Sequence, residues 1–109
     1  MEDIKAPDTI KLGVHQFRVV FNKLLIDAQV YGRTSFSNEY IQLNPTNTDA
    51  QNNVSFWHEV LHAIYSQQLG IGLSEEGACS LSEGITDILS QLGVTLDFSN
   101  LKEEGSRNG

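Results

Sequence analysis

Three residues in the second half of the chain have the types and the spacing of a metal site. His58 and His62 stand four positions apart in the segment HEVLH, and Glu59 follows the first histidine. In a helix, residues four apart lie on the same face, because one turn takes 3.6 residues. Both imidazoles can then reach one ion, and Zn²⁺ accepts imidazole nitrogen at about 2.0–2.1 Å. Glu59 lies about 100° further around such a helix, close enough to meet a water at the metal without having to bind the ion itself.

A catalytic zinc ion needs a third protein ligand and leaves its fourth position to water. The segment EGITD offers Glu83 and Asp87, which are again four residues apart and follow His62 along the chain. One of these carboxylates can bind the metal while the other accepts a hydrogen bond from a ligand histidine. Glu76 and Cys79 stay open as alternatives, since each shares a helical face with Glu83. A lone cysteine is, however, more often a small buried hydrophobe than a ligand.

HEVLH followed by SEGITD resembles the gluzincins, the thermolysin-like branch of the HExxH zinc metallopeptidases. The resemblance implies that His58, His62 and Glu83 bind zinc, that Glu59 is the general base, and that Asp87 accepts a hydrogen bond from the first histidine. The segment YGRTSFSNEYIQLNP is also similar to small metallopeptidase-like proteins encoded by phages and prophages. The expected activity is therefore zinc-dependent hydrolysis of a peptide or protein substrate.

Large gluzincins have a further helical subdomain that supplies a His or Tyr to stabilise the oxyanion, whereas only about twenty residues follow Asp87 here. Tyr65, Tyr40, Tyr31 and His15 are the candidates for this role, and none stands out. The alternative to an enzyme is a zinc-stabilised interaction module without turnover, such as a phage structural or regulatory protein, because a bound metal can stabilise a small domain. The glutamate between the histidines argues mildly against this alternative, since a purely structural site has no use for a general base.

The composition excludes several classes of partner. The formal net charge is −7, and the seven basic residues among 109 form no run, which argues against a nucleic-acid partner. Cys79 is the single cysteine, so no intramolecular disulfide can form. The first residues lack the apolar core of a signal peptide, and no apolar stretch has the length of a membrane span. We therefore expect a soluble protein of a reducing cytoplasm (the host cytoplasm if phage-encoded) that has no membrane partner.

The front half of the chain predicts strands. Residues 9–21 alternate between apolar and polar side chains, with Gly13 at a turn, and residues 31–36 and 40–43 indicate two more strands around a polar turn. Residues 24–31 fit either a short helix or an extended segment. Asn44-Pro45 ends the strand region, since proline cannot continue a central ladder. By analogy with zincins, a substrate could pair with residues 40–43 if they form an edge strand.

The back half predicts two helices. Thr48 and Gln51 have the spacing of a capping box for a first helix that ends near residue 69. Ser74 can cap a second helix that ends at Gly93 and has Glu75 and Glu76 in its first turn, where the helix dipole favours acids. The apolar stripe of that helix comprises Ala78, Leu81, Ile85, Ile88, Leu89 and Leu92. Gly84, beside the expected ligand, would be explained by a close approach of the two helices, and equally by an accident of sequence.

These elements predict a single α+β domain over residues 1–104, with a small antiparallel or mixed sheet of about three strands followed by two helices that carry the metal site, as in a minimal zincin-like fold. The first residues, to about Pro7, are expected to be frayed. Residues 105–109 are expected to form a disordered tail.

Overall fold

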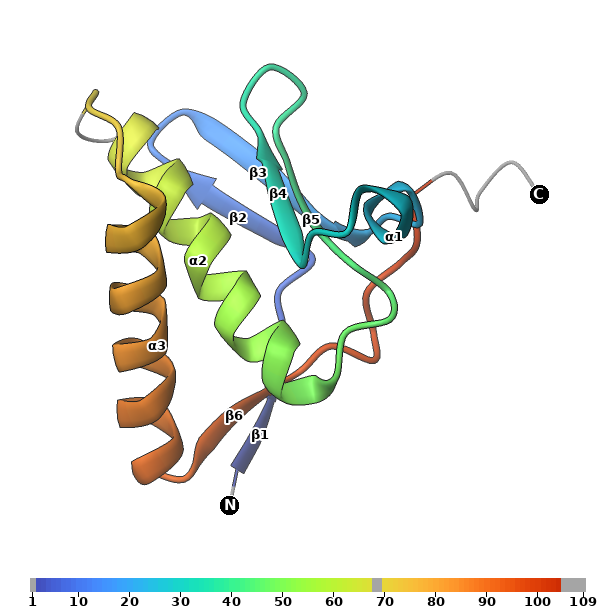
Figure 1. Cartoon of the computed structure of the whole chain (residues 1–109), viewed down its shortest axis with the longest axis vertical. Helices are drawn as coiled ribbons and strands as arrows, with labels where there is room; N and C mark the ends of the chain where they lie inside the picture. Colours follow the sequence, from blue (N-terminus) through green and yellow to red (C-terminus); the bar gives the residue numbers. More distant parts are fainter. Residues whose placement is uncertain (1, 68–69, 105–109) are drawn as a thin grey trace.

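The computed structural model describes residues 2–67 and 70–104 and has the expected α+β class. It contains six strands in two sheets and three helices, more than the sequence predicts. In chain order these are β1 (Glu2–Lys5), β2 (Thr9–Leu12), β3 (His15–Phe21), α1 (Leu24–Ala28), β4 (Gly32–Ser35), β5 (Tyr40–Leu43), α2 (Asp49–Gln67), α3 (Glu75–Gln91) and β6 (Val94–Asp97) (Figure 1).

The main sheet is four-stranded and mixed, with the order β2-β3-β5-β4. β2 pairs antiparallel with β3, β5 runs parallel to β3, and β4 pairs antiparallel with β5. β5 is thus a central strand, and the prediction that residues 40–43 form an edge is wrong. The edge strands are β2 and β4, because the chain passes through α1 and β4 before β5 inserts between β3 and β4.

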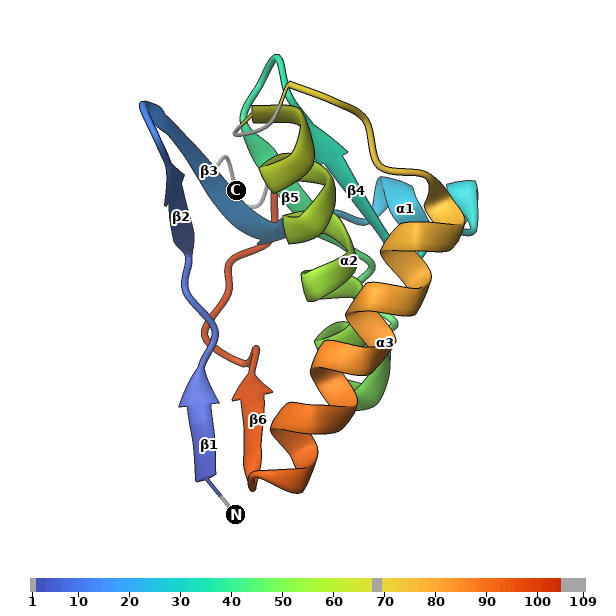
Figure 2. The same cartoon turned by 90° about the vertical axis from the view of Figure 1, so that its left-hand side faces the viewer.

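Helix α2 lies between this sheet and α3 (Figures 1 and 2). It contacts β2, β4 and β5 on one side and α3 on the other. The core forms where α2 meets the sheet, and its buried members are Ala6, Phe17, Val19, Ile41, Leu43, Phe56, Val60, Ala63, Phe98 and Leu101. The central helix of the molecule is therefore the one that carries the HExxH segment.

The first residues form a strand, not the expected frayed start. β1 pairs in parallel with β6, with Ile4 opposite Leu96, and the pair stands apart from the main sheet (Figure 2). The partner strand lies some ninety residues away in the sequence and follows both long helices, so no local pattern near the N-terminus reveals it. The tail predicted at residues 105–109 lies outside the described residues.

The predicted helix starts and turns are confirmed. The backbone N–H of Thr48 donates to the Gln51 side chain at 2.8 Å, and the N–H of Gln51 donates back to the Thr48 hydroxyl at 3.2 Å. The hydroxyl of Ser74 accepts from the N–H of Gly77 at 3.0 Å at the start of α3. Gly13 has a φ of 63° in the β2–β3 turn, a conformation that favours glycine.

The outer face of α3 departs from the prediction. Ala78 is buried, but Leu81, Ile88 and Leu92 are 41%, 57% and 71% exposed. A side chain at Gly84 would meet no atom within 4 Å, so this glycine marks no close approach of helices. α3 is the outermost layer, with only part of its apolar stripe turned toward α2. Across the described ranges, no helix is both long and apolar enough to cross a membrane.

Candidate metal centre

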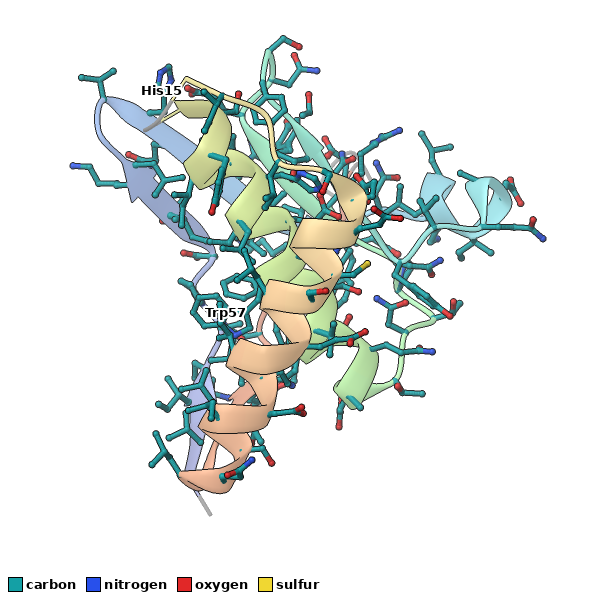
Figure 3. The ribbon with its side chains drawn as sticks, turned by 60° about the vertical axis from the view of Figure 1, so that its left-hand side comes forward. His15 and Trp57 are labelled. Carbon is teal, nitrogen blue, oxygen red and sulfur yellow. The ribbon has the colours of Figure 1, made fainter. Side chains whose placement is uncertain are left out.

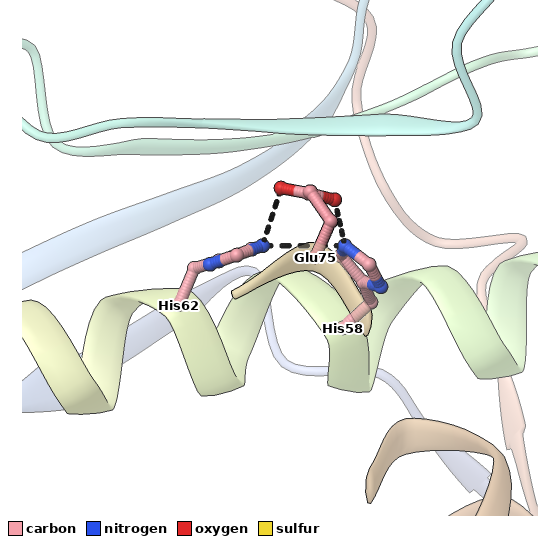
Figure 4. Close-up of side chains that lie close together, drawn as sticks. All are labelled: His58, His62 and Glu75. Carbon is pink, nitrogen blue, oxygen red and sulfur yellow. Dashed lines mark hydrogen bonds and ion pairs between the residues drawn. The ribbon is translucent and has the colours of Figure 1, made fainter. Parts of the chain in front are cut away.

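The two histidines of the HExxH segment converge as predicted. His58 and His62 occupy successive turns of α2, and their Nε2 atoms lie 3.2 Å apart (Figure 4). A carboxylate from α3 completes the group: Oε1 of Glu75 lies 3.0 Å from Nε2 of His58, and Oε2 lies 3.0 Å from Nε2 of His62. Two helices therefore bring three metal-ligating side chains to one point.

The spacing of these atoms fits a metal ion. Two ligand atoms bound to a tetrahedral zinc at about 2.0–2.1 Å lie roughly 3.3 Å from each other, close to the separations found here. All three ligand atoms fall within 4.8 Å of one another, and within residues 2–67 and 70–104 this is the only such group of His, Cys, Asp or Glu. Two imidazoles and one carboxylate form a donor set used by catalytic zinc. The group could therefore hold a metal ion.

The three side chains differ in exposure. The side chains of His58 and His62 are 15% and 17% exposed, whereas that of Glu75 is 78% exposed. Glu75 is the first residue of α3 and directly follows its cap, Ser74, so its position is fixed by where this helix begins. The histidines are thus the buried members of the group, and Glu75 is its solvent-exposed member.

Glu83, the predicted third ligand, is not part of this group. It is exposed on α3, eight residues after Glu75, which corresponds to about 12 Å along the helix axis. The alternative, Glu76, is exposed beside Glu75 and also lies outside the group. The sequence did not predict Glu75 as a ligand, because the helix dipole is already a sufficient explanation for an acid in a first turn.

Asp87 is not beside the first histidine either. It is exposed and lines a separate cavity with Asp49 and Trp57, nearer the start of α2. The group that faces Nδ1 of His58 is instead the thiol of Cys79, with Sγ at 3.8 Å. Cys79 lies one turn after Glu75 and is exposed, so the expectation of a buried cysteine is wrong.

Glu59 is buried next to the histidines, with 7% of its surface exposed. The hydroxyl of Thr34 in β4 donates to Oε1 of Glu59 at 2.6 Å. Burial raises the pKa of the Glu59 carboxyl, while the Thr34 hydrogen bond and the nearby histidines lower it in part. The net direction is upward, so this carboxylate holds a proton more readily than an exposed glutamate.

Gly32 gives Glu59 the space it occupies. A Cβ built on Gly32 would lie 3.1 Å from Cγ of Glu59 and 3.2 Å from the main-chain oxygen of Gln42. Both contacts are tighter than ordinary packing, and the second is to backbone, which cannot yield easily. Gly32 and Thr34 together make β4 one wall of the pocket around Glu59, a role that sequence patterning does not reveal.

These residues open onto a cleft of about 430 Å³ between β4 and the α2–α3 corner. Its lining comprises Val30, Gly32, Arg33, Thr34, Phe36, Glu59, His62 and Glu75.

None of the four residues considered for the oxyanion lines this cleft. His15, the first residue of β3, pairs with Glu39 of the β4–β5 turn at 2.7 Å, and Figure 3 shows it well away from α3. Tyr40 lies under the guanidinium of Arg18, with 4.9 Å to the ring centroid. Arg33 is the one lysine or arginine in the cleft lining.

No protein family, no curated protein and no solved structure matches this chain.

Proposed function

We propose that this protein is a zinc-dependent hydrolase of peptide bonds. The observation that carries the proposal is the placement of Glu59, a buried carboxylate beside the His58–His62–Glu75 group, at a cleft bounded by an edge strand. A purely structural metal site has no need of such a carboxylate and usually has four protein ligands. The described group offers three, which leaves a coordination position for water or substrate.

His58, His62 and Glu75 would hold the zinc ion, in place of the set with Glu83 that the gluzincin resemblance implies. Bound zinc supplies Lewis-acid polarisation of a carbonyl group and of a water molecule. Imidazole nitrogens suit several transition metals, and the mixed set of two imidazoles and one carboxylate is typical of catalytic zinc. His62 and Glu75 both line the cleft, and Glu75 is 78% exposed, so a metal held by this group would be accessible from solvent.

Glu59 acts as general base. Its raised pKa improves the match between its proton affinity and that of the group it must deprotonate. The Thr34 hydroxyl fixes Oε1, so the carboxylate cannot swing freely between rotamers. The proton taken up by Glu59 can then be passed to the leaving amine, as a base in hydrolysis must do for turnover.

The edge strand β4 could bind an extended peptide as an additional strand of the sheet. The N–H of Asn44 donates to the carbonyl of Tyr31, which makes these two residues a hydrogen-bonded pair. Hydrogen-bonded pairs alternate along an antiparallel ladder, so the backbone groups of Gly32 and Thr34 point away from β5. A peptide that adds to this edge therefore pairs with the two residues that contact Glu59.

The decisive experiment compares wild-type protein with Glu59→Gln on an unstructured peptide library in the presence of zinc. We expect cleavage by the wild type and loss of cleavage by Glu59→Gln, with zinc content unchanged, because the amide keeps the shape but not the base. Glu76→Gln is the matched control, since it removes a neighbouring carboxylate outside the group and should cleave normally.

Cleavage by Glu59→Gln at the wild-type rate would show that Glu59 is not the base. A wild-type protein that holds one zinc equivalent and cleaves nothing would favour the non-catalytic zinc module. Chelation should also lower the unfolding temperature, because a ligand that binds only the native state stabilises it by mass action.

A further inference from the structure

A second cavity lies toward the other end of α3, where α2, α3 and β6 meet. Its volume is about 490 Å³, within the range of roughly 300–1,000 Å³ usual for small-molecule sites. Asp87, which lines it, follows Glu75 by twelve residues, or about 18 Å along the helix axis. The cavity is therefore distinct from the cleft at the histidines.

The floor of this cavity is apolar and comes from all three elements: Val54, Trp57, Leu89, Val94 and Leu96. Trp57 projects from α2 beside α3 (Figure 3) and is the one tryptophan of the chain. It packs edge-on against Phe56, with ring centroids 5.3 Å apart. The floor can thus cover an apolar body, and its indole can interact with a cation.

The charged residues of the lining are all acidic: Asp49 in the first turn of α2, Asp87 on α3, and Asp97 at the end of β6. Asp97 already pairs with Lys5 at 3.1 Å. Asp49 and Asp87 form no ion pair with any residue in the described part of the chain. The lining therefore combines apolar side chains with negative charge, and two of its carboxylates have no ion-pair partner among the described residues.

A metal ion does not suit this arrangement. The three aspartates do not converge to within metal-ligand distance, since the histidine site is the one group in residues 2–67 and 70–104 that does. An organic cation suits this cavity better, because its apolar part can contact the apolar side chains of the lining while its charge interacts with the carboxylates. A neutral molecule would gain nothing from the charge of the aspartates, and an anion would be repelled by it.

We propose that the cavity between α2, α3 and β6 binds a small organic cation, with a primary ammonium group on an aromatic or aliphatic body. The apolar body lies on Trp57 and its neighbours, and the ammonium faces Asp49 and Asp87. This site works without the metal and without turnover, so it stands independently of the proposed hydrolase activity.

The test uses the fluorescence of Trp57, which lines this cavity and is the one tryptophan of the chain. Metal-free protein is titrated at low ionic strength with phenethylammonium, with the neutral 2-phenylethanol and with the anionic 3-phenylpropionate. We expect the ammonium to bind roughly 2- to 30-fold more tightly than the alcohol, as expected for two partly exposed carboxylate pairs. The anion should bind more weakly than the alcohol, and added salt should reduce the preference for the cation.

Three variants locate the effect. Asp49→Asn combined with Asp87→Asn should abolish the preference for the ammonium over the alcohol, whereas Asp27→Asn on α1, an exposed acid outside the cavity, should leave it intact. Ala50→Leu, which adds bulk to the cavity lining, should weaken all three probes. Equal binding of ammonium and alcohol by the wild type overturns the proposal. So does the absence of any fluorescence change, or unaltered binding by the double aspartate variant.

Discussion

The two long helices contribute to the candidate metal centre in different ways. α2 lies between the sheet and α3 and presents its two histidines from a largely buried position, with side chains 15% and 17% exposed. α3 forms the outer layer, exposes Ile88 and Leu92 at 57% and 71%, and presents Glu75 from its first turn with the side chain 78% exposed. α2 packs between the sheet and α3, whereas α3 lies on the outside of the molecule and carries Glu75 at its first turn.

The rigidly packed part of the candidate site is therefore on α2, and its solvent-accessible part is on α3. Two of the proposed ligands, His58 and His62, and the proposed base, Glu59, all lie on α2, so their relative positions are set within one helix. Glu75, the proposed third ligand, lies at the solvent-facing corner, with its side chain 78% exposed. If this division is correct, truncation of a buried side chain in α2 should damage the fold, whereas removal of Glu75 at the start of α3 should damage metal binding while sparing the fold.

The largest effect is expected from truncation in α2. Phe56 is 3% exposed and stacks edge-on with Trp57 and Phe98. Phe56→Ala should lower the free energy of unfolding by about 3–5 kcal/mol, through lost burial and the cavity left behind. Ile88→Ala on α3, where 57% of the surface is exposed, should change it by no more than about 0.5 kcal/mol. Urea denaturation of both variants measures the contrast, and equal losses would contradict the distinction between the helices.

The next effect concerns the third ligand. Glu75→Ala should weaken zinc binding by more than the roughly 10–100-fold that follows loss of a ligand's hydrogen-bond partner, with the fold retained. Glu76→Ala is the matched control, since it removes the same kind of first-turn charge, worth only about 0.3–1 kcal/mol of helix stability.

Competitive zinc titration ranks these variants together with Glu83→Ala. We expect Glu75→Ala to be the most damaged, while Glu76→Ala and Glu83→Ala stay near wild type. Loss of zinc in Glu83→Ala but not in Glu75→Ala would restore the ligand set that the gluzincin resemblance implies.

A smaller effect is expected from Thr34 of β4, which contacts Glu59, the proposed general base on α2. Thr34→Val keeps the shape of the side chain but removes the hydroxyl that donates to Glu59. Peptide hydrolysis should fall roughly 10–100-fold, the range for losing a hydrogen bond to a charged group, with zinc content unchanged. Thr34→Ser retains the hydroxyl and should recover most of the rate. Equal rates in Thr34→Val and wild type would remove Thr34 from the positioning of Glu59.

The same contrast explains which parts of the site the sequence could predict. The convergence of His58 and His62 follows from the period of one helix, so local spacing is sufficient. The third ligand depends on where α3 begins and how it crosses α2, which the spacing within α3 does not determine. Glu83 and Asp87 share a face, as predicted, but that spacing does not specify what the face contacts. Helix starts, by contrast, depend on side chains within one turn, and those predictions were confirmed at Thr48 and Ser74.

Long-range pairing accounts for the remaining differences in the fold. Residues 40–43 were correctly predicted as a strand, yet the central place of this strand in the sheet depends on a parallel pairing with β3 across α1 and β4. The β1–β6 pair joins the two ends of the described chain. Apolar periodicity was also insufficient for α3, since in an outer helix part of the stripe stays exposed.

The smallest effect concerns how the far end of α3 is attached, through β6. Asp97 closes this strand: it accepts hydrogen bonds from the N–H of Ser99 at 2.9 Å and from Lys5 of β1 at 3.1 Å. These bonds, chiefly those from Ser99, lower the pKa of Asp97 to about 2, against about 3.9 for an unperturbed aspartate. A lowered pKa means that the folded state favours the ionised form, so the contribution is complete above about pH 4 and is lost as the pH falls through about 2.

Asp97→Asn should therefore be slightly less stable than wild type at neutral pH, and the difference should shrink as the pH falls below about 4. Urea midpoints measured across this range test the sign, with Asp27→Asn on α1 as the control for loss of an exposed acid. A difference that stays constant with pH would mean that the ionised carboxylate, through Ser99 and Lys5, does not stabilise the end of β6. The attachment of α3 at this end would then rest on contacts such as those between Asn53 of α2 and Leu96 of β6, where the side-chain oxygen accepts from the Leu96 N–H at 3.0 Å.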